Sequence, residues 1–248
     1  MLYLVLVGIF GACMGSFTSM LLHRLPKMKD DESVNLFYPR SSCPDCKNKL
    51  SVSALIPIFS YLWQKGVCKF CKKSISSFYL INEIIHCCVV LLIALYVGIN
   101  VEGLLYYFIF FILYILFFLD YKYLYLPFYL NLTLIPLGIL INYLFNTFTT
   151  LYLSIGGMII GYSLLWMVNA IYKAFRSKNG IGGGDFILLA GLGSVFGIMA
   201  LGPIIFLGSS ISIIIYLLTN KSPNEEIPFG SGLIIGAIIF NLLKIFIN

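Results

Sequence analysis

Two aspartates, each at the edge of an apolar run, are the residues of this chain best suited to catalysis. Asp120 follows "YILFFL", and Asp185 follows three consecutive glycines in "GIGGGDFILLAGLG". Two carboxyl groups that meet in a poorly solvated site cannot comfortably both ionise, so they share one proton. The charged member then activates a water molecule while the protonated member polarises a carbonyl. This is the chemistry of aspartyl proteases.

The glycines before Asp185 have a suitable role in such a site. Gly182, Gly183 and Gly184 lack Cβ atoms, so we expect their backbone to adopt otherwise strained angles and to lie close to an extended substrate peptide. A structural explanation also exists for each aspartate. Asp185 is well placed to cap a helix that begins at a glycine-rich turn. Asp120 is equally explained as the partner of Lys122 in a turn.

Four cysteines predict a metal centre elsewhere in the chain. They form two C-x-x-C pairs, "CPDC" with Cys43 and Cys46 and "CKFC" with Cys68 and Cys71. This is the arrangement of a tetrathiolate zinc ribbon. Because protein sulfur fills all four ligand positions, the expected zinc is structural rather than catalytic. Disulfides or redox dithiols are the alternative, and they are disfavoured in a reducing cytoplasm.

The elements that must position these residues are membrane helices. The chain has 248 residues, of which 60% are hydrophobic and 10% charged, and its mean hydropathy is +0.97. A soluble globule is excluded by this composition. Since a helix needs roughly 20 apolar residues to cross a bilayer, we predict an all-α polytopic membrane protein with about eight transmembrane helices. The expected spans are 2–22, 78–98, 103–119, 124–145, 150–172, 184–200, 202–219 and 230–247.

The placement of basic residues predicts the orientation of these spans. Of the 16 Lys and Arg residues, 15 fall in four regions, and only Lys244 lies elsewhere. Cytoplasmic loops collect such residues, so both termini are expected outside and both aspartates at the cytoplasmic boundary. The net charge of +6 therefore does not indicate a nucleic-acid partner. The four basic regions are 23–77, 120–123, 173–183 and 220–229.

This topology predicts three parts in the chain. Residues 1–22 form the first transmembrane helix, 23–77 a cytoplasmic zinc-binding loop domain, and 78–248 a seven-helix membrane aspartyl protease core. Zinc is expected to fold the loop domain, because a loop of about 50 residues that is rich in Lys, Ser and Pro has little core of its own.

The sequence resembles the type IV prepilin peptidases, which are membrane aspartyl proteases of the G-x-G-D type. The resemblance covers nearly the whole chain, and its motifs occur in the family's order. In this sequence they read "GSFTSMLLHRLP", "PRSSCPDC", "IPIFSYLWQKGVCKFC", "FYLINE", "FLDYKYLYLP", "GIGGGDFILLAGLG" and "IPFGSGLIIGA", the last of which resembles the family element P-F-G-P-x-L.

The resemblance implies specific roles for residues of this sequence. Asp120 and Asp185 are the catalytic dyad, and Gly182 and Gly184 are the glycines of G-x-G-D. Glu83 matches a family glutamate and is a candidate methylation-site residue, with a buried hydrogen-bonded glutamate as the alternative. The implied activity is removal of the short basic leader from type IV prepilins or pseudopilins at the cytoplasmic face of the bacterial cytoplasmic membrane. Many members then N-methylate the new N-terminus with S-adenosylmethionine.

Two other classes of function remain open at this point. Glycine-broken helices and buried carboxylates also form ion sites, so the chain fits a polytopic transporter or channel. A zinc-anchored membrane scaffold without protease activity is the third possibility. The expected partners are a prepilin or pseudopilin and membrane lipid, with no nucleic acid, and the expected context is type IV pilus assembly or protein secretion.

Overall fold

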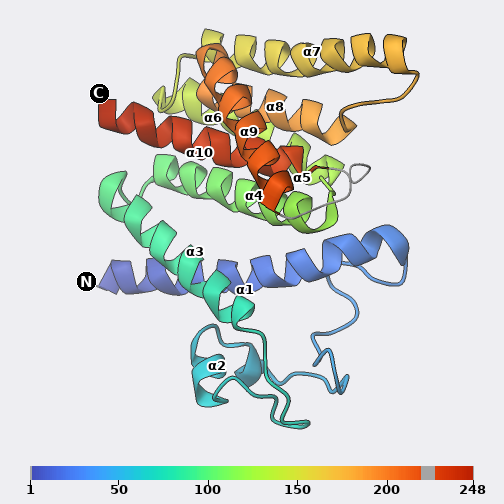
Figure 1. Cartoon of the computed structure of the whole chain (residues 1–248). Coiled ribbons are helices and arrows are strands. Elements are labelled where there is room, and N and C mark those ends of the chain that lie inside the picture. The colour runs from blue at the N-terminus through green and yellow to red at the C-terminus, as the bar shows by residue number, and fades with distance from the viewer. Residues whose placement is uncertain (1, 219–226, 248) are drawn as a thin grey trace. The chain divides into compact units, whose positions relative to one another are not determined.

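The chain is built from helices throughout the part that the structure describes. The computed structural model describes residues 2–218 and 227–247 (Figure 1), and within these ranges two isolated β-bridges form but no sheet. The predicted all-α class is confirmed. The elements are α1 (Leu2–Asp30), η1 (Val52–Leu55), α2 (Phe59–Trp63), α3 (Ser77–Tyr96), α4 (Val101–Tyr123), α5 (Phe128–Leu132), α6 (Leu134–Phe145), α7 (Leu151–Arg176), α8 (Gly183–Phe196), α9 (Ile198–Leu218) and α10 (Phe229–Ile247).

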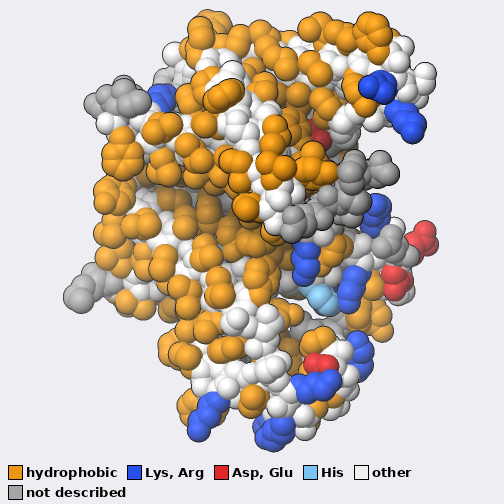
Figure 2. Space-filling model, in the orientation of Figure 1, with side chains coloured by type: hydrophobic (Ala, Val, Ile, Leu, Met, Phe, Trp, Pro, Cys, Tyr) orange, Lys and Arg blue, Asp and Glu red, His pale blue; other side chains and the backbone are white. Residues whose placement is uncertain are grey.

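Eight apolar helical segments follow the predicted spans. Six of them are long and apolar enough to cross a membrane, counting α5 and α6 as one segment. The other two, α8 and α10, are shorter apolar helices. Hydrophobic side chains accordingly cover most of the visible helical surface in Figure 2, as expected of a surface that faces lipid.

Several boundaries differ from the expected ones. Helix α1 continues to Asp30 instead of ending near residue 22. Its helical hydrogen bonds extend beyond the apolar run from which the span was predicted. The expected 120–123 turn is wrong, since α4 continues to Tyr123 and the chain turns at Leu124, which has a φ of 52°. The expected loop 220–229 lies mostly outside the described residues.

The chain divides into two compact units, residues 1–107 and 108–248, and each is described by itself. In the first unit, α1 packs along α3 at glycine contacts. A Cβ atom at Gly15 would lie 2.5 Å from the carbonyl oxygen of Asn82, so only glycine permits this approach. The loop between α1 and α3 carries the four cysteines. The three-part division expected from the sequence stays a prediction.

Helix α8 lies at the centre of the second unit. It contacts α5, α6, α7, α9 and α10. Its residues from Phe186 to Val195 are apolar or small and almost all buried, as expected of a helix that is hydrophobic on every side. Backbone meets backbone where α7 crosses α8, because a Cβ atom at either Gly157 or Gly193 would collide with the carbonyl of the other. The core thus fixes α8, and with it Asp185.

Candidate active site and metal centre

Asp120 lies in the last turn of α4, where it is 6% exposed. Its Oδ2 atom accepts two hydrogen bonds from Ser231, at 2.5 Å from the backbone N–H and at 2.8 Å from the hydroxyl. Ser231 is the third residue of α10, so the carboxylate of Asp120 caps the start of a helix that is distant in the sequence. The turn pairing with Lys122 is replaced by this contact between α4 and α10.

Asp185 lies in the first turn of α8 and is 9% exposed. Its backbone N–H donates to the carbonyl of Gly182, and its carboxylate accepts a hydrogen bond from the N–H of Gly182. The helix-cap interpretation therefore describes this residue correctly. Its Oδ1 atom is buried and has no hydrogen-bond partner. An unpaired buried oxygen is costly, which sets this residue apart from an ordinary cap.

The two aspartates lie within electrostatic range of each other, so the negative charge of Asp120 acts on Asp185. The contact of α8 with α10 contributes to this arrangement, because Asp185 is on α8 and the partner of Asp120 is on α10. Leu126 lies between the two sites, since Cβ atoms placed at Gly184 and at Gly230 would both meet its side chain. That the two carboxyl groups share one proton stays a prediction.

The expectation of strained backbone at the three glycines is wrong. Among the described residues the glycines with positive φ lie elsewhere, and Gly182 has ordinary extended angles, φ −68° and ψ 143°. The limited space around two of these glycines explains their presence better than backbone strain does. A Cβ atom at Gly184 would lie 2.8 Å from Cβ of Leu126, and one at Gly182 would lie 3.2 Å from Oδ2 of Asp185. Gly183 has open space at its Cβ position.

Sequence reasoning missed Ser231 and Asn131. Asn131, on α5, is fully buried, and its Nδ2 atom donates to the carbonyl oxygen of Gly184 at 2.7 Å. Its own Oδ1 is buried without a hydrogen-bond partner. It thus holds the backbone directly before Asp185. The sequence offered one signal for Ser231 and Asn131, which is that each is a polar residue inside an apolar run. The sequence around them contains no motif that identifies the residue that each one contacts.

The four cysteines come together as the sequence predicted. Their sulfur atoms all lie within 4.8 Å of one another. Ligands of a tetrahedral zinc with Zn–S bonds of ~2.3 Å would lie roughly 3.8 Å apart, so the cluster fits the metal. Each pair forms the same tight loop, closed by the bridges Ser42–Lys49 and Val67–Ser74. Lys73 joins the two loops through a 2.7 Å ion pair with Asp45.

The thiols of this cluster differ in acidity. Backbone N–H groups of Cys71 and Phe70 lower the pKa of the Cys68 thiol to about 6. At Cys71 a hydrogen bond from the backbone N–H of Lys73 lowers the pKa of the thiol. Burial and the three neighbouring sulfurs outweigh this effect and raise the pKa to about 11. Four crowded sulfurs thus do not all become thiolates at neutral pH without a cation, and a divalent metal supplies the missing charge.

Glu83 lies in a buried polar layer between α1 and α3. Its Oε2 atom accepts a 2.6 Å hydrogen bond from the backbone N–H of Ile58, which belongs to the cysteine loop. One turn further along α3, the His86 ring contacts the Thr18 hydroxyl at 3.1 Å and the Tyr107 hydroxyl at 2.9 Å. The hydrogen-bonded glutamate is therefore observed, and its part in methylation stays a prediction.

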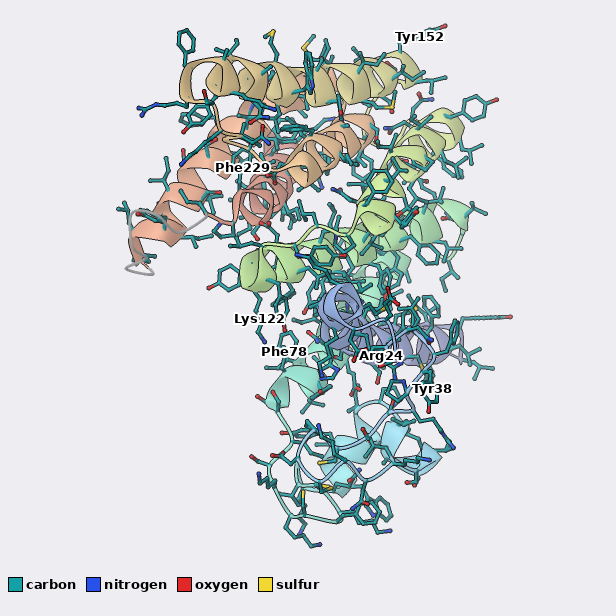
Figure 3. All side chains as sticks on the ribbon, turned by 90° about the vertical axis from the view of Figure 1, so that its right-hand side faces the viewer. Arg24, Tyr38, Phe78, Lys122, Tyr152 and Phe229 are labelled. Atoms are coloured by element: carbon teal, nitrogen blue, oxygen red, sulfur yellow. The ribbon has the colours of Figure 1, made fainter. Side chains whose placement is uncertain are left out.

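Arg24 ties α1 to the first part of the cysteine loop. It is 9% exposed and donates to the carbonyl oxygens of Asn35 at 2.8 Å and Pro39 at 2.5 Å. Figure 3 shows it beside the segment that carries Tyr38. The loop is thereby fixed to the helix from which it departs.

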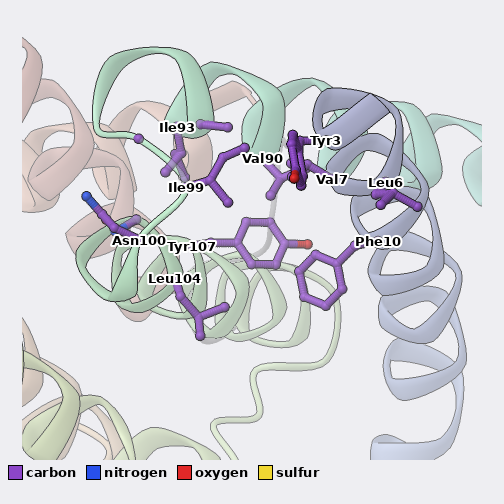
Figure 4. A pocket seen from close by; sticks show the side chains of 13 residues that line it. Tyr3, Leu6, Val7, Phe10, Val90, Ile93, Ile99, Asn100, Leu104 and Tyr107 are labelled. Atoms are coloured by element: carbon purple, nitrogen blue, oxygen red, sulfur yellow. The ribbon is translucent and has the colours of Figure 1, made fainter. Parts of the chain in front are cut away.

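A separate apolar cavity of about 320 Å³ occurs in the first unit (Figure 4). Residues of α1, α3 and the start of α4 line it, and the rings of Phe10 and Tyr107 pack there with centroids 5.6 Å apart. It contains neither aspartate nor any cysteine of the metal centre. It is therefore not part of the candidate active site.

Comparison with known proteins identifies the family of this chain. A model of the bacterial peptidase A24 N-terminal domain matches residues 9–97, and a model of the type IV leader peptidase family matches residues 106–218. A prepilin leader peptidase/N-methyltransferase of Aeromonas salmonicida is 33% identical over 96% of this chain and 90% of its own length. The chain belongs to the type IV leader peptidase family.

Other relatives carry the same name. The prepilin leader peptidase/N-methyltransferase of Neisseria gonorrhoeae is 34% identical over 95% of this chain and 89% of its own length. The prepilin leader peptidase/N-methyltransferase of Pseudomonas putida is 30% identical over 96% of this chain and 89% of its own length. No solved structure matches the chain. The two family models separate in the sequence close to the boundary between the two compact units.

Proposed function

We propose that this protein is a membrane aspartic endopeptidase that removes the leader of type IV prepilins or pseudopilins, with Asp120 and Asp185 as its catalytic dyad. The observation that carries the proposal is the pair of buried carboxyl groups within electrostatic range, in a chain of the leader peptidase family. Gly182, Gly183 and Gly184 are the proposed substrate-positioning residues, and the open space at the Cβ position of Gly183 supports the approach of an extended peptide there. The transporter and scaffold alternatives have no comparable support.

The proposed topology places the dyad at the cytoplasmic membrane boundary. Its support is the distribution of Lys and Arg, which favours cytoplasmic loops at 23–77 and 173–183. A prepilin docks its apolar helix against the spans, with its basic leader in the cytoplasm and the scissile bond beside the two carboxyl groups. Water attacks directly, because this arrangement needs no covalent intermediate.

The cleavage assay tests the dyad. Full-length protein in detergent is incubated with a prepilin, and the loss of the leader is followed as a size shift. Asp120→Asn and Asp185→Asn are each expected to abolish cleavage, because sharing a proton requires both carboxyl groups. Asp45→Asn is the matched control, since this aspartate pairs with Lys73 beside the cysteines. Cleavage by a folded Asp185→Asn protein would refute the dyad.

We further propose that the first unit N-methylates the new N-terminus. The support is the match of residues 9–97 to the N-terminal domain model and the names of the relatives. S-adenosylmethionine is the proposed methyl donor, Glu83 a residue of the methylation site, and a structural zinc the organiser of the cysteine loop that contacts Glu83. Transfer of labelled methyl groups to a cleaved pilin tests this. Glu83→Gln should lose the label while still cleaving, and loss of both activities would contradict the assignment.

A further inference from the structure

We propose that Ser231 is a positioning residue that keeps Asp120 ionised, so that Asp120 is the base of the dyad and Asp185 carries the shared proton. The inference rests on the proposed function, because it divides roles within that dyad. The inference goes beyond the proposed function because it assigns a different protonation state to each aspartate and names the residue that causes the difference.

The hydrogen bonds of Asp120 identify it as the charged member. Its Oδ2 atom accepts from both the N–H and the hydroxyl of Ser231, at 2.5 and 2.8 Å. An ionised carboxylate is an acceptor only, and bonds donated to it favour the charged form. The same hydroxyl lies 3.2 Å from the carbonyl of Phe117, so its proton is shared, whereas the N–H is directed at Asp120.

The start of α10 adds to this preference. Ser231 contributes one of the first N–H groups of that helix, which have no partner within the helix. The amino-terminal end of a helix also carries partial positive charge. Gly230 makes the approach feasible, because a Cβ atom there would lie 3.1 Å from Oδ2 of Asp120. The carboxylate of Asp120 therefore accepts a hydrogen bond from a free N–H group at the start of α10, and the start of α10 in turn stabilises the negative charge of the carboxylate.

Asp185 receives less support for a negative charge. Gly182 donates one backbone N–H to it, and its Oδ1 is buried with no partner. Asp185 also lies in the first turn of a helix, so helix polarity acts on both aspartates and the number of donors decides between them. Since two close carboxylates do not both ionise readily, the proton resides on Asp185.

These states yield a balanced hydrolysis. Ionised Asp120 takes a proton from water as the water oxygen bonds to the peptide carbon, and protonated Asp185 gives its proton to the carbonyl oxygen. Asp120 then passes its proton to the amide nitrogen as the C–N bond breaks. Asp185 recovers a proton from the diol. Acid and amine leave, and both aspartates return to their starting states.

Few other charges act on Asp120. Among the described ionisable groups, Asp185 on α8 is the one that Asp120 acts on electrostatically, and Tyr121 and Lys122 follow Asp120 on α4 itself. The first turn of α10 contains no ionisable residue. The resembled element P-F-G-P-x-L carries proline at the position of Ser231, and proline has no N–H to donate. Ser231 therefore supplies a backbone donor that proline at this position would lack.

The pH profile of cleavage tests the role of Ser231 in the full-length protein with a prepilin substrate. Ser231→Ala removes the hydroxyl, Ser231→Pro removes both donors, and Ser231→Thr keeps both. With fewer donors Asp120 stays protonated to higher pH, so the acidic limb of the profile moves to higher pH. On that acidic limb, Ser231→Ala should cleave about tenfold more slowly than wild type and Ser231→Pro more slowly still, whereas Ser231→Thr should stay within about twofold. At the alkaline plateau the cleavage rates of all three variants should change little.

Ser212→Ala is the matched control. Ser212 lies on α9 and is also buried, but its hydroxyl donates to the carbonyl of Pro228, directly before α10, and no hydrogen bond joins it to Asp120. Its pH profile should keep the wild-type midpoint. An unchanged acidic limb in Ser231→Ala and Ser231→Pro would overturn the inference, as would an equal loss at every pH. Cleavage by Asp120→Asn or Asp185→Asn would instead refute the dyad itself, so the two failures are distinguishable.

Discussion

At the scale of single residues, two buried asparagines bind the backbone of α8 near its two ends. Asn131 donates to the carbonyl of Gly184, next to Asp185. Asn142 donates to the carbonyls of Ser194 and Val195, near the other end of the helix. Both side chains are fully buried, so each is expected to matter for stability. Only Asn131 lies beside the proposed chemistry.

Replacing the two asparagines separates these effects. Asn131→Ala and Asn142→Ala should each lower the free energy of unfolding by about 1–3 kcal/mol, because each removes buried hydrogen bonds to the backbone of α8. Asn131→Ala should in addition lower kcat about tenfold, since Asp185 loses its fixed backbone. Thermal unfolding and initial cleavage rates measure the two quantities. Equal kcat in both variants would contradict a positioning role for Asn131.

At the scale of helices, the crossing of α7 and α8 depends on glycine. A Cβ atom at Gly157 would collide with the backbone of Gly193, while one at the adjacent Gly156 would meet nothing within 4 Å. The first position therefore faces α8, and the second faces away from the protein. No side chain at this crossing can rotate to make room.

Two adjacent substitutions test the crossing. Gly157→Ala should force α7 and α8 apart and lower both the yield of folded protein and cleavage by tenfold or more, as overpacking of a core does. Gly156→Ala should leave both within about twofold of wild type, because its methyl group enters open space. Detergent-solubilised yield and cleavage rate are the measurements. Similar behaviour of the two variants would rule out the tight crossing.

The sequence predicted those elements and residues whose chemistry contrasts with their surroundings. Charges in apolar runs marked Asp120 and Asp185, and cysteine spacing marked the metal cluster, whose sulfurs the structure brings together. Hydropathy located the spans but not the end of α1, because a helix continues where apolar character stops. Ser231 could not be assigned, since its contact with Asp120 joins positions 111 residues apart.

At the scale of the whole molecule, the proposed metal and the proposed dyad belong to different units. The four cysteines lie in residues 1–107 and both aspartates in 108–248. Removing zinc should therefore unfold the cysteine loop and lower the folding yield before it changes peptide-bond cleavage. This order of effects distinguishes a structural metal from a catalytic one.

Metal analysis of cysteine variants tests this separation. Purified wild type should contain about one zinc per chain, and Cys43→Ser combined with Cys46→Ser should contain none, because two thiolates rarely retain a structural zinc. Cys88→Ser, an exposed cysteine on α3, should leave the zinc content unchanged. Retention of zinc by the double variant would refute the tetrathiolate site.

The hydrogen-bond donors of both aspartates are backbone amides and one hydroxyl from the ends of buried helices. Dissolved ions screen exposed charges strongly and buried dipoles weakly. Capture of a basic leader by the protein surface should thus respond to ionic strength, whereas bond cleavage after capture should not. Salt then changes KM and leaves kcat almost constant, so an enzyme of this design turns over a bound precursor at the same rate in dilute and in concentrated cytoplasm.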